Sequence, residues 1–103
     1  MELRINFSGY ECFVMHRKYP QNNRNAIELI DTEDCIPVAV ASVNIPDANL
    51  EDDEILIKGW SENKGMEKIL MDAGIIGPII GEVPTGFVFA TKHKLLKLPE
   101  KTN

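Results

Sequence analysis

The sequence predicts an α+β fold: a mostly antiparallel sheet of five or six strands, with one amphipathic helix over about residues 62–73 packed on one face. Short apolar segments of strand length alternate with turn residues along most of the chain, which is typical of strands joined by hairpins. One stretch, residues 51–76, combines an acidic lead-in, a strand, an amphipathic helix and a glycine stop. Because these local signals agree, we expect the fold to be organised around this stretch.

Four strands are expected in the first half of the chain. Apolar and polar residues alternate over residues 2–7, as in a half-buried strand that a Ser-Gly pair ends. Residues 10–19 carry bulky apolar side chains on both faces and complete a hairpin. Residues 25–31 are short enough to favour a strand over a helix. Residues 36–46 are small and β-branched on both faces, as in a central strand, so residues 32–35 form the turn of a second hairpin.

The middle of the chain predicts a strand followed by the helix. Residues 46–52 form a surface connection, and residues 54–60 form the strand. Ser61 is the expected N-cap of the helix, and Gly74 is its expected C-terminal stop. Gly65, inside the first turns, should cost the helix about 1 kcal/mol relative to alanine. The buried stripe has i, i+3, i+4, i+7 spacing and consists of Met66, Ile69, Leu70 and Ala73.

The end of the chain predicts a loop and a last strand. Residues 75–86 are apolar but are interrupted by three glycines and two prolines. Because such a segment cannot be regular throughout, we expect a partly buried loop that leads into a strand over residues 86–96. A single domain is expected over residues 1–98, followed by a flexible tail, residues 99–103.

The composition is that of one soluble domain. A chain of 103 residues can build one modest core, and this one has no apolar run of the roughly 18 residues that a membrane helix needs. The amino terminus lacks an apolar signal-peptide core followed by a cleavage site, so we expect a cytoplasmic protein without membrane contact. In that setting Cys12 and Cys35 are expected to be two buried thiols rather than a disulfide.

Negative charge is concentrated in the middle of the sequence. The net charge of the chain is −5, whereas residues 28–72 alone carry twelve acidic and three basic side chains. An acidic surface repels nucleic-acid phosphate, and the aromatic residues lack the accompanying basic residues of a nucleic-acid platform. We therefore expect no direct nucleic-acid binding.

The residues that could carry chemistry form no recognisable motif. Cys12, His16, Cys35 and His93 are the only candidate soft-metal set, and the absence of a CxxC pair argues against zinc. Cys12 lies within a strand, where no helix N-terminus lowers its pKa for nucleophilic attack. The glycine-rich segment 77–86 lacks the lysine-serine ending of a phosphate loop. We expect no catalytic residue, no metal and no cofactor.

The acidic run 51–54 and its surroundings form the candidate partner-binding site. It can be interpreted as a hard-cation site, although the spacing and glycine of a calcium loop are absent, or as a charged edge that prevents sheet association. It can also be interpreted as a phosphate-like array for a basic groove of a partner protein. Trp60, the only tryptophan, is either a core residue or an apolar anchor at that interface. The predicted partner-binding residues are Asp47, Glu51, Asp52, Asp53, Glu54 and Trp60.

Several short motifs follow one another between about Val40 and Val88: VASVNIPDANLEDDEILIKGWSENKGMEKILMDAGII and, later, VPTGFV. In this order they resemble a family of small uncharacterised proteins carried by conjugative elements, plasmids and phages of gut Firmicutes and Bacteroidetes, catalogued as a domain of unknown function. That family has no assigned catalytic residues. The resemblance implies a genomic setting in which small accessory proteins often occlude host defence machines, including CRISPR effectors and restriction enzymes, and this is an argument by association.

Charge and resemblance together lead to one hypothesis and one alternative. The hypothesis is a non-enzymatic protein-binding module of a mobile genetic element, such as an anti-CRISPR inhibitor, whose acidic surface occludes a basic nucleic-acid channel of a host effector. The alternative is a structural or regulatory accessory protein of a conjugative element that forms homo-oligomers through an exposed sheet edge.

Overall fold

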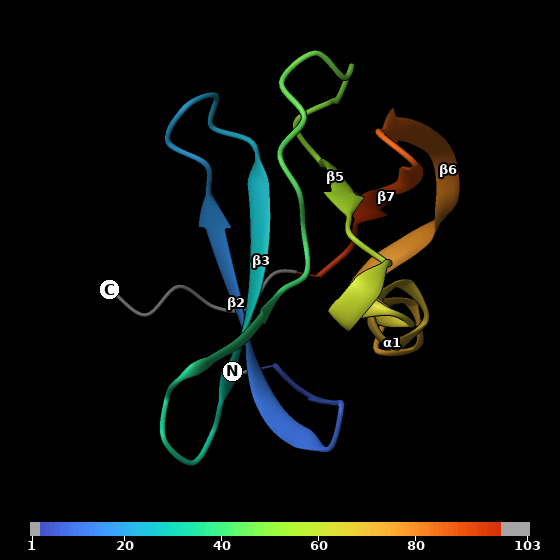
Figure 1. Cartoon of the computed structure of the whole chain (residues 1–103). Helices are drawn as coiled ribbons and strands as arrows, with labels where there is room; N and C mark the ends of the chain where they lie inside the picture. The colour runs from blue at the N-terminus through green and yellow to red at the C-terminus, as the bar shows by residue number, and fades with distance from the viewer. Residues whose placement is uncertain (1–2, 98–103) are drawn as a thin grey trace.

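Residues 3–97 are described by the structure, a computed structural model (Figure 1). The strands are β1 (Arg4–Phe7), β2 (Tyr10–Lys18), β3 (Asn25–Asp31), β4 (Pro37–Val40), β5 (Glu54–Ile57), β6 (Ile76–Thr85) and β7 (Val88–Leu95). The helical segments are a 3₁₀ turn, η1 (Ser61–Asn63), and an α-helix, α1 (Met66–Asp72). Within this range no helix is long and apolar enough to cross a membrane. The predicted flexible tail, residues 99–103, lies outside the described residues.

The strands form two antiparallel sheets. The four-stranded sheet has the order β1-β2-β3-β4, and the three-stranded sheet has the order β5-β7-β6. The α+β class, the antiparallel pairing and the single short α-helix agree with the prediction. The predicted five or six strands are corrected to seven, in sheets of four and three.

The two sheets meet just after β4, where the chain changes its pairing partner. The Ala41 amide donates to the Ile27 carbonyl of β3 (2.8 Å), and the Ala41 carbonyl accepts from the Lys58 amide just after β5 (2.8 Å). The Val43 amide then donates to the Leu56 carbonyl of β5 (3.1 Å). This short segment therefore lies between β3 and β5 and joins the two sheets along their edges.

The predicted strand over residues 36–46 is only partly correct. β4 ends at Val40, whose side chain is exposed rather than covered. Beyond it, Ser42 makes an isolated bridge to Ile57. The Ser42 hydroxyl also accepts from the Ile27 amide (3.0 Å). The Ser42 hydroxyl oxygen thus replaces a backbone carbonyl as the acceptor for the Ile27 amide of β3, because the chain after β4 bonds to β5 instead.

The core lies between the two sheets and α1. Its buried members are Ile5, Phe7, Cys12, Val14, Ile27, Leu29, Ala39, Ala41, Ile55, Ile57, Met66, Leu70, Ile75 and Ile76. From the helix, Met66 and Leu70 are fully buried, and Ile69 and Ala73 pack against the same cluster. The predicted apolar stripe is therefore confirmed, and through it α1 packs against β1 and β6.

The predicted start of the helix is wrong. Residues 61–63 form the 3₁₀ turn, and α1 begins only at Met66. Ser61 caps neither helical segment, because the N-cap positions are Trp60 and Gly65. Gly65 has a φ of 89°, a left-handed conformation that glycine adopts at little cost. It therefore separates the two helical segments instead of weakening the interior of one long helix.

The predicted loop over residues 75–86 is β6 instead. The strand pairs with β7 through two irregularities of register, between Ile76 and Ile79 and between Ile79 and Gly81, which accommodate its prolines and glycines. β6 is an edge strand of its sheet, where proline is tolerated because one side of the backbone has no partner strand. In the two-residue turn that follows, Gly86 has a positive φ of 70°, as the first position of a type II′ turn requires.

Candidate functional site

All five of the predicted partner-binding acids lie at one end of the molecule. In Figure 1 the loop after β2 (residues 19–24) and the connection before β5 (residues 44–53) project from the same end. We call this region the acidic end and define it by Asp47 and residues 51–54. A polar hollow of about 170 Å³ lies there, lined by Asn22, Asn23, Arg24, Asn25, Leu50, Glu51, Asp52 and Glu54.

Arg24 ties the connection before β5 to the loop after β2. Its guanidinium donates to the carbonyl of Ile45 (2.8 Å) and to that of Ala48. Asn22 adds one further link, because its Nδ2 donates to Asn44 Oδ1 (3.0 Å), while its Oδ1 accepts from the Arg24 amide (3.3 Å) within the loop itself. The acidic end is therefore held by side-chain hydrogen bonds, which reduce the entropy lost when a partner binds.

Asn25 fixes the acidic run from inside the molecule. It is buried, and its Nδ2 donates to the carbonyls of Asp52 (2.9 Å) and Glu54 (3.0 Å). Because the amide nitrogen is used in this way, Asn25 Oδ1 accepts from Nε2 of His16 (2.9 Å). The backbone of the acidic run is thus hydrogen-bonded to the start of β3.

Two of the predicted acids are occupied within the chain. Glu54 is buried, its carboxylate accepts from the Glu51 amide (2.9 Å), and it lies 3.6 Å from Lys94 Nζ. Asp53 accepts from the same lysine (2.9 Å), and this hydrogen bond raises the pKa of Lys94. Glu54 shapes the connection, and Asp53 shares the charge of Lys94, so neither offers a full negative charge to a partner.

The other three acids of this end are not paired in this way within residues 3–97. Asp47, Glu51 and Asp52 are all exposed. None of the ion pairs found among residues 3–97 involves them. The candidate interface therefore consists of three acids, Asp47, Glu51 and Asp52, rather than the five that the sequence predicts.

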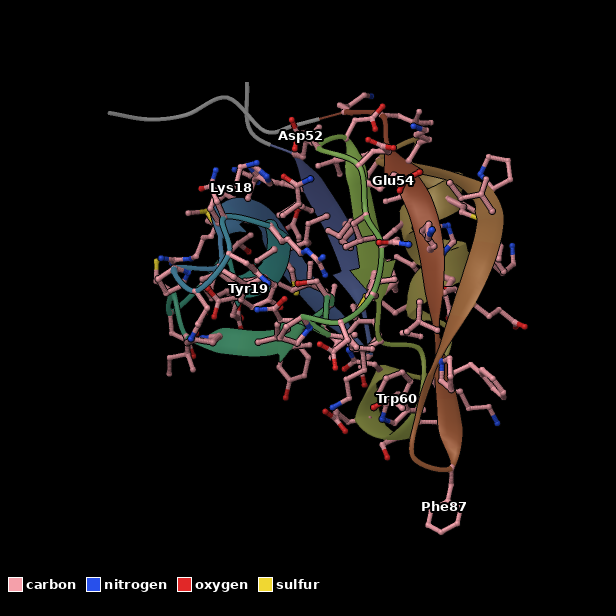
Figure 2. The ribbon with its side chains drawn as sticks, turned by 90° about the horizontal axis from the view of Figure 1, so that it is seen from above. Lys18, Tyr19, Asp52, Glu54, Trp60 and Phe87 are labelled. Carbon is pink, nitrogen blue, oxygen red and sulfur yellow. The ribbon has the colours of Figure 1, made fainter. Side chains whose placement is uncertain are left out.

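Trp60 does not belong to the acidic end. In Figure 2, Asp52 lies at one end of the view, and Trp60 and Phe87 lie at the other. The strand register explains this separation, because Ile57 pairs with Thr91 in antiparallel fashion. The chain that leaves β5 toward Trp60 consequently runs alongside the part of β7 nearest to the β6–β7 turn.

Trp60 lies instead at an aromatic end of the molecule. It is half-buried, and Lys58 Nζ lies 5.9 Å from the centre of its ring. Phe87, in the β6–β7 turn, is fully exposed, and Phe89 is exposed as well. Lys58 also pairs with Glu62 (2.8 Å), and this hydrogen bond lowers the pKa of Glu62. The predicted anchor and the predicted acids thus occupy different surfaces.

A second group of acids from the middle of the sequence lies at the other end of the four-stranded sheet, far from the acidic end. Asp31, Glu33 and Asp34 lie at the end of β3 opposite to Asn25, about 20 Å away along the strand. Asp31 is buried, and its Oδ1 accepts from the Glu33 amide (2.9 Å), which shapes the turn that follows β3. The acids of residues 28–72 therefore do not form one continuous surface.

Titratable and nucleophilic groups are dispersed through the fold. His93 is fully buried, with Nδ1 donating to the Gly77 carbonyl (2.8 Å) and Nε2 hydrogen-bonded to the Thr91 hydroxyl (2.8 Å). Cys12 is buried, and its burial, together with the negative charge of Asp31, raises the pKa of its thiol. Within residues 3–97, no three His, Cys, Asp or Glu side chains are arranged to hold a metal ion.

Both cysteines are free thiols, but only one is buried. Cys12 lies in the core, whereas Cys35 is exposed, so the expectation of two buried thiols is wrong for Cys35. Cys35 has a positive φ of 60°, and its amide donates to the Asp31 carbonyl (2.9 Å). It closes the turn after β3, and this position leaves its side chain outside the core.

Arg24 and Asn25 were not identified from the sequence. Their polar run, QNNRN, has no periodicity and matches no motif. Asparagines beside an arginine indicate a loop held by side-chain hydrogen bonds. They do not indicate which backbone carbonyls, more than 20 residues further along, will accept those bonds.

The chain was compared with protein-family models, with curated proteins and with solved structures, and none of them matches it. The surface of the chain itself must therefore indicate what it binds.

Proposed function

We propose that the protein is a non-enzymatic protein-binding module whose acidic end engages a basic surface of a partner protein. The observation that carries this proposal is the set of Asp47, Glu51 and Asp52, which are exposed and in no ion pair within residues 3–97. Their backbone is held by hydrogen bonds from Arg24 and Asn25. Charge on an ordered backbone attracts and orients a partner at a lower entropic cost than charge on a free loop.

The partner class follows from charge and from the family resemblance. A short array of carboxylates can replace phosphates in a groove lined by lysine and arginine. The resemblance of residues 40–88 to proteins of mobile elements makes the proposed partner a nucleic-acid-targeting effector of host defence, such as a CRISPR nuclease. In this mechanism the acidic end occupies the nucleic-acid channel of the effector. Trp60 is not assigned to this interface, because it lies at the aromatic end.

A pull-down from lysate of a CRISPR-bearing host, with three baits, tests the proposal. The wild-type protein should retain a nuclease subunit at low salt and release it as rising ionic strength screens the charges. The acidic-end variant, Asp47→Lys/Glu51→Lys/Asp52→Lys, should retain at least about tenfold less of it.

The matched control is Glu62→Lys/Asp72→Lys/Glu82→Lys. It makes the same change in net charge at three exposed positions outside the acidic end, and it should bind as the wild type does. Equal retention of the partner by the two triple variants would contradict the proposal.

The alternative hypothesis, self-association through a sheet edge, has less support from the edges themselves. β1 has only four residues, and β6 carries Pro78 and Pro84 together with two irregularities of register. At the end of β4, Asn63 Nδ2 donates to the Val40 carbonyl (2.7 Å) and covers it. Short, irregular or covered edges are the features by which proteins prevent edge pairing.

A further inference from the structure

The outer face of the four-stranded sheet, on the side away from the core, carries an apolar strip bordered by two ion pairs, Arg4 with Glu11 (3.7 Å) and Arg17 with Glu28 (3.0 Å). A hollow of about 610 Å³ lies on it, lined by Phe13, Met15, Arg17, Glu28, Ile30, Cys35 and Pro37. Met15 is 37% exposed and Val40, next to Glu28 in the register of β3 and β4, is 48% exposed. Apolar side chains gathered in this way on a small protein indicate an interaction surface.

The outward residues of β2 form a charge pattern that is complementary to itself. In order along the strand they are Glu11, Phe13, Met15 and Arg17, that is, an acid, two apolar residues and a base. The residues between them, Cys12 and Val14 among them, face the core. When the strand is reversed, the acid is superposed on the base and one apolar residue on the other.

We propose that a second copy of the chain packs on this face about a two-fold axis that lies in the interface, parallel to the sheet and perpendicular to β2, above the midpoint between Phe13 and Met15. The two β2 strands then run in opposite directions, so that Glu11 faces the partner's Arg17 and Phe13 faces the partner's Met15. Sheets that pack face to face lie about 10 Å apart with interdigitated side chains. The ion pair of Arg17 with Glu28 (3.0 Å) then lies within the interface beside Met15, because Glu28 is opposite Met15 in the register of β2 and β3.

The symmetry of the pattern is the reason for choosing a second copy as the occupant. Glu11 and Arg17 lie at equal distances along the strand from the centre of the apolar pair, a condition that a two-fold axis requires and that an unrelated partner does not. The dimer leaves the acidic ends free and directs them away from each other, because those ends lie beyond the strand termini. It is independent of the proposed function, and either can fail alone.

Sedimentation velocity of the full chain, from about 1 to about 200 µM, tests the dimer. The wild-type protein should be dimeric at the upper concentration and should dissociate on dilution. Met15→Lys places a charge at the centre of the interface and should weaken association about 100-fold or more. Leu96→Lys, at a position 62% exposed beyond β7, is the control and should dimerise as the wild type does.

A charge swap separates association from folding. Glu11→Lys and Arg17→Glu each place like charges across the axis and should weaken the dimer about tenfold. The double variant Glu11→Lys/Arg17→Glu brings opposite charges together again and should recover most of the lost affinity. If Glu11 and Arg17 act only within the monomer, the double variant should associate at least as weakly as either single variant. That result, or a wild-type protein that is monomeric at the highest concentration, would overturn the proposal.

Discussion

The Arg24 guanidinium donates a 2.8 Å hydrogen bond to the Ile45 carbonyl, 21 residues further along the chain. A second bond from the same group reaches the Ala48 carbonyl, so one side chain holds both sides of the turn that carries Asp47. This relationship makes the position of an exposed carboxylate depend on a half-buried arginine in another loop. Substitution of Arg24 therefore tests directly whether these hydrogen bonds hold the acidic end in place.

Arg24→Ala should lower the free energy of unfolding by about 2 kcal/mol, because two carbonyls lose a charged donor. Urea denaturation measures this change. Lys68→Ala is the control, since it removes only an exposed i,i+4 pair with Asp72 and should change the free energy of unfolding far less. Equal losses in the two variants would show that Arg24 does not hold the connection.

Gly65→Ala should destabilise the protein, opposite to the effect expected for a glycine inside a helix. The backbone at Gly65 has a φ of 89°, and a methyl group there would contact nothing within 4 Å, so the cost is conformational and about 1 kcal/mol. Gly81→Ala is the matched control, because its methyl group would make ordinary contacts with the Lys92 side chain. A higher melting temperature for Gly65→Ala would contradict the position of the helix start.

Leu70→Ala should cost about 3 kcal/mol of unfolding free energy, because it opens a cavity among fully buried side chains between α1 and the sheets. Leu96→Ala, at a position 62% exposed, should change stability by less than about 0.5 kcal/mol. Chemical denaturation of both variants compares the two. A small loss for Leu70→Ala would mean that the helix does not pack on the core as described.

The native protein should expose one reactive thiol. Cys35 is exposed, whereas Cys12 is buried and its pKa is raised by burial and by the charge of Asp31. At about pH 8 a thiol reagent should modify Cys35 at once and Cys12 only when the chain unfolds. Cys35→Ser should remove the fast reaction. Rapid modification of two thiols in the folded protein would contradict the burial of Cys12.

Cys12 should also contribute to alkaline unfolding. Its pKa in the folded protein is raised above the ordinary value of 9.0, so folding favours the protonated thiol. This contribution is fully present below about pH 9 and is lost as the pH rises through the raised pKa. Cys12→Ala should therefore lose stability less steeply with rising pH in this range than the wild type. Parallel pH profiles for the two proteins would contradict the assignment.

Elements with a strong local pattern could be predicted from the sequence. The alternation in β1 and the stripe that buries Met66 and Leu70 depend on side-chain spacing alone. β6 could not be predicted in this way, because prolines and glycines interrupt its pattern and only pairing with β7 makes it a strand. The division into two sheets depends on Ala41, whose amide and carbonyl bond to different strands.

The candidate site was predictable in charge but not in geometry. Asp47, Glu51 and Asp52 are recognisable as surface acids from their sequence alone. The pairing of Asp53 with Lys94, 41 residues away, depends on the register of β5 with β7. Because of the same register, Trp60 lies away from the acidic end, so Trp60 and the acidic run 51–54 are close in the sequence but separated in the fold.

The central claim is that Asp47, Glu51 and Asp52 replace nucleic-acid phosphates on a basic partner. Displacement of fluorescently labelled DNA from the partner recovered by pull-down, followed by anisotropy at low salt, tests it most directly. The wild type and the Glu62→Lys/Asp72→Lys/Glu82→Lys control should displace DNA at the same concentration, and the acidic-end variant should need at least about tenfold more protein. Displacement by the acidic-end variant at the wild-type concentration would contradict the account.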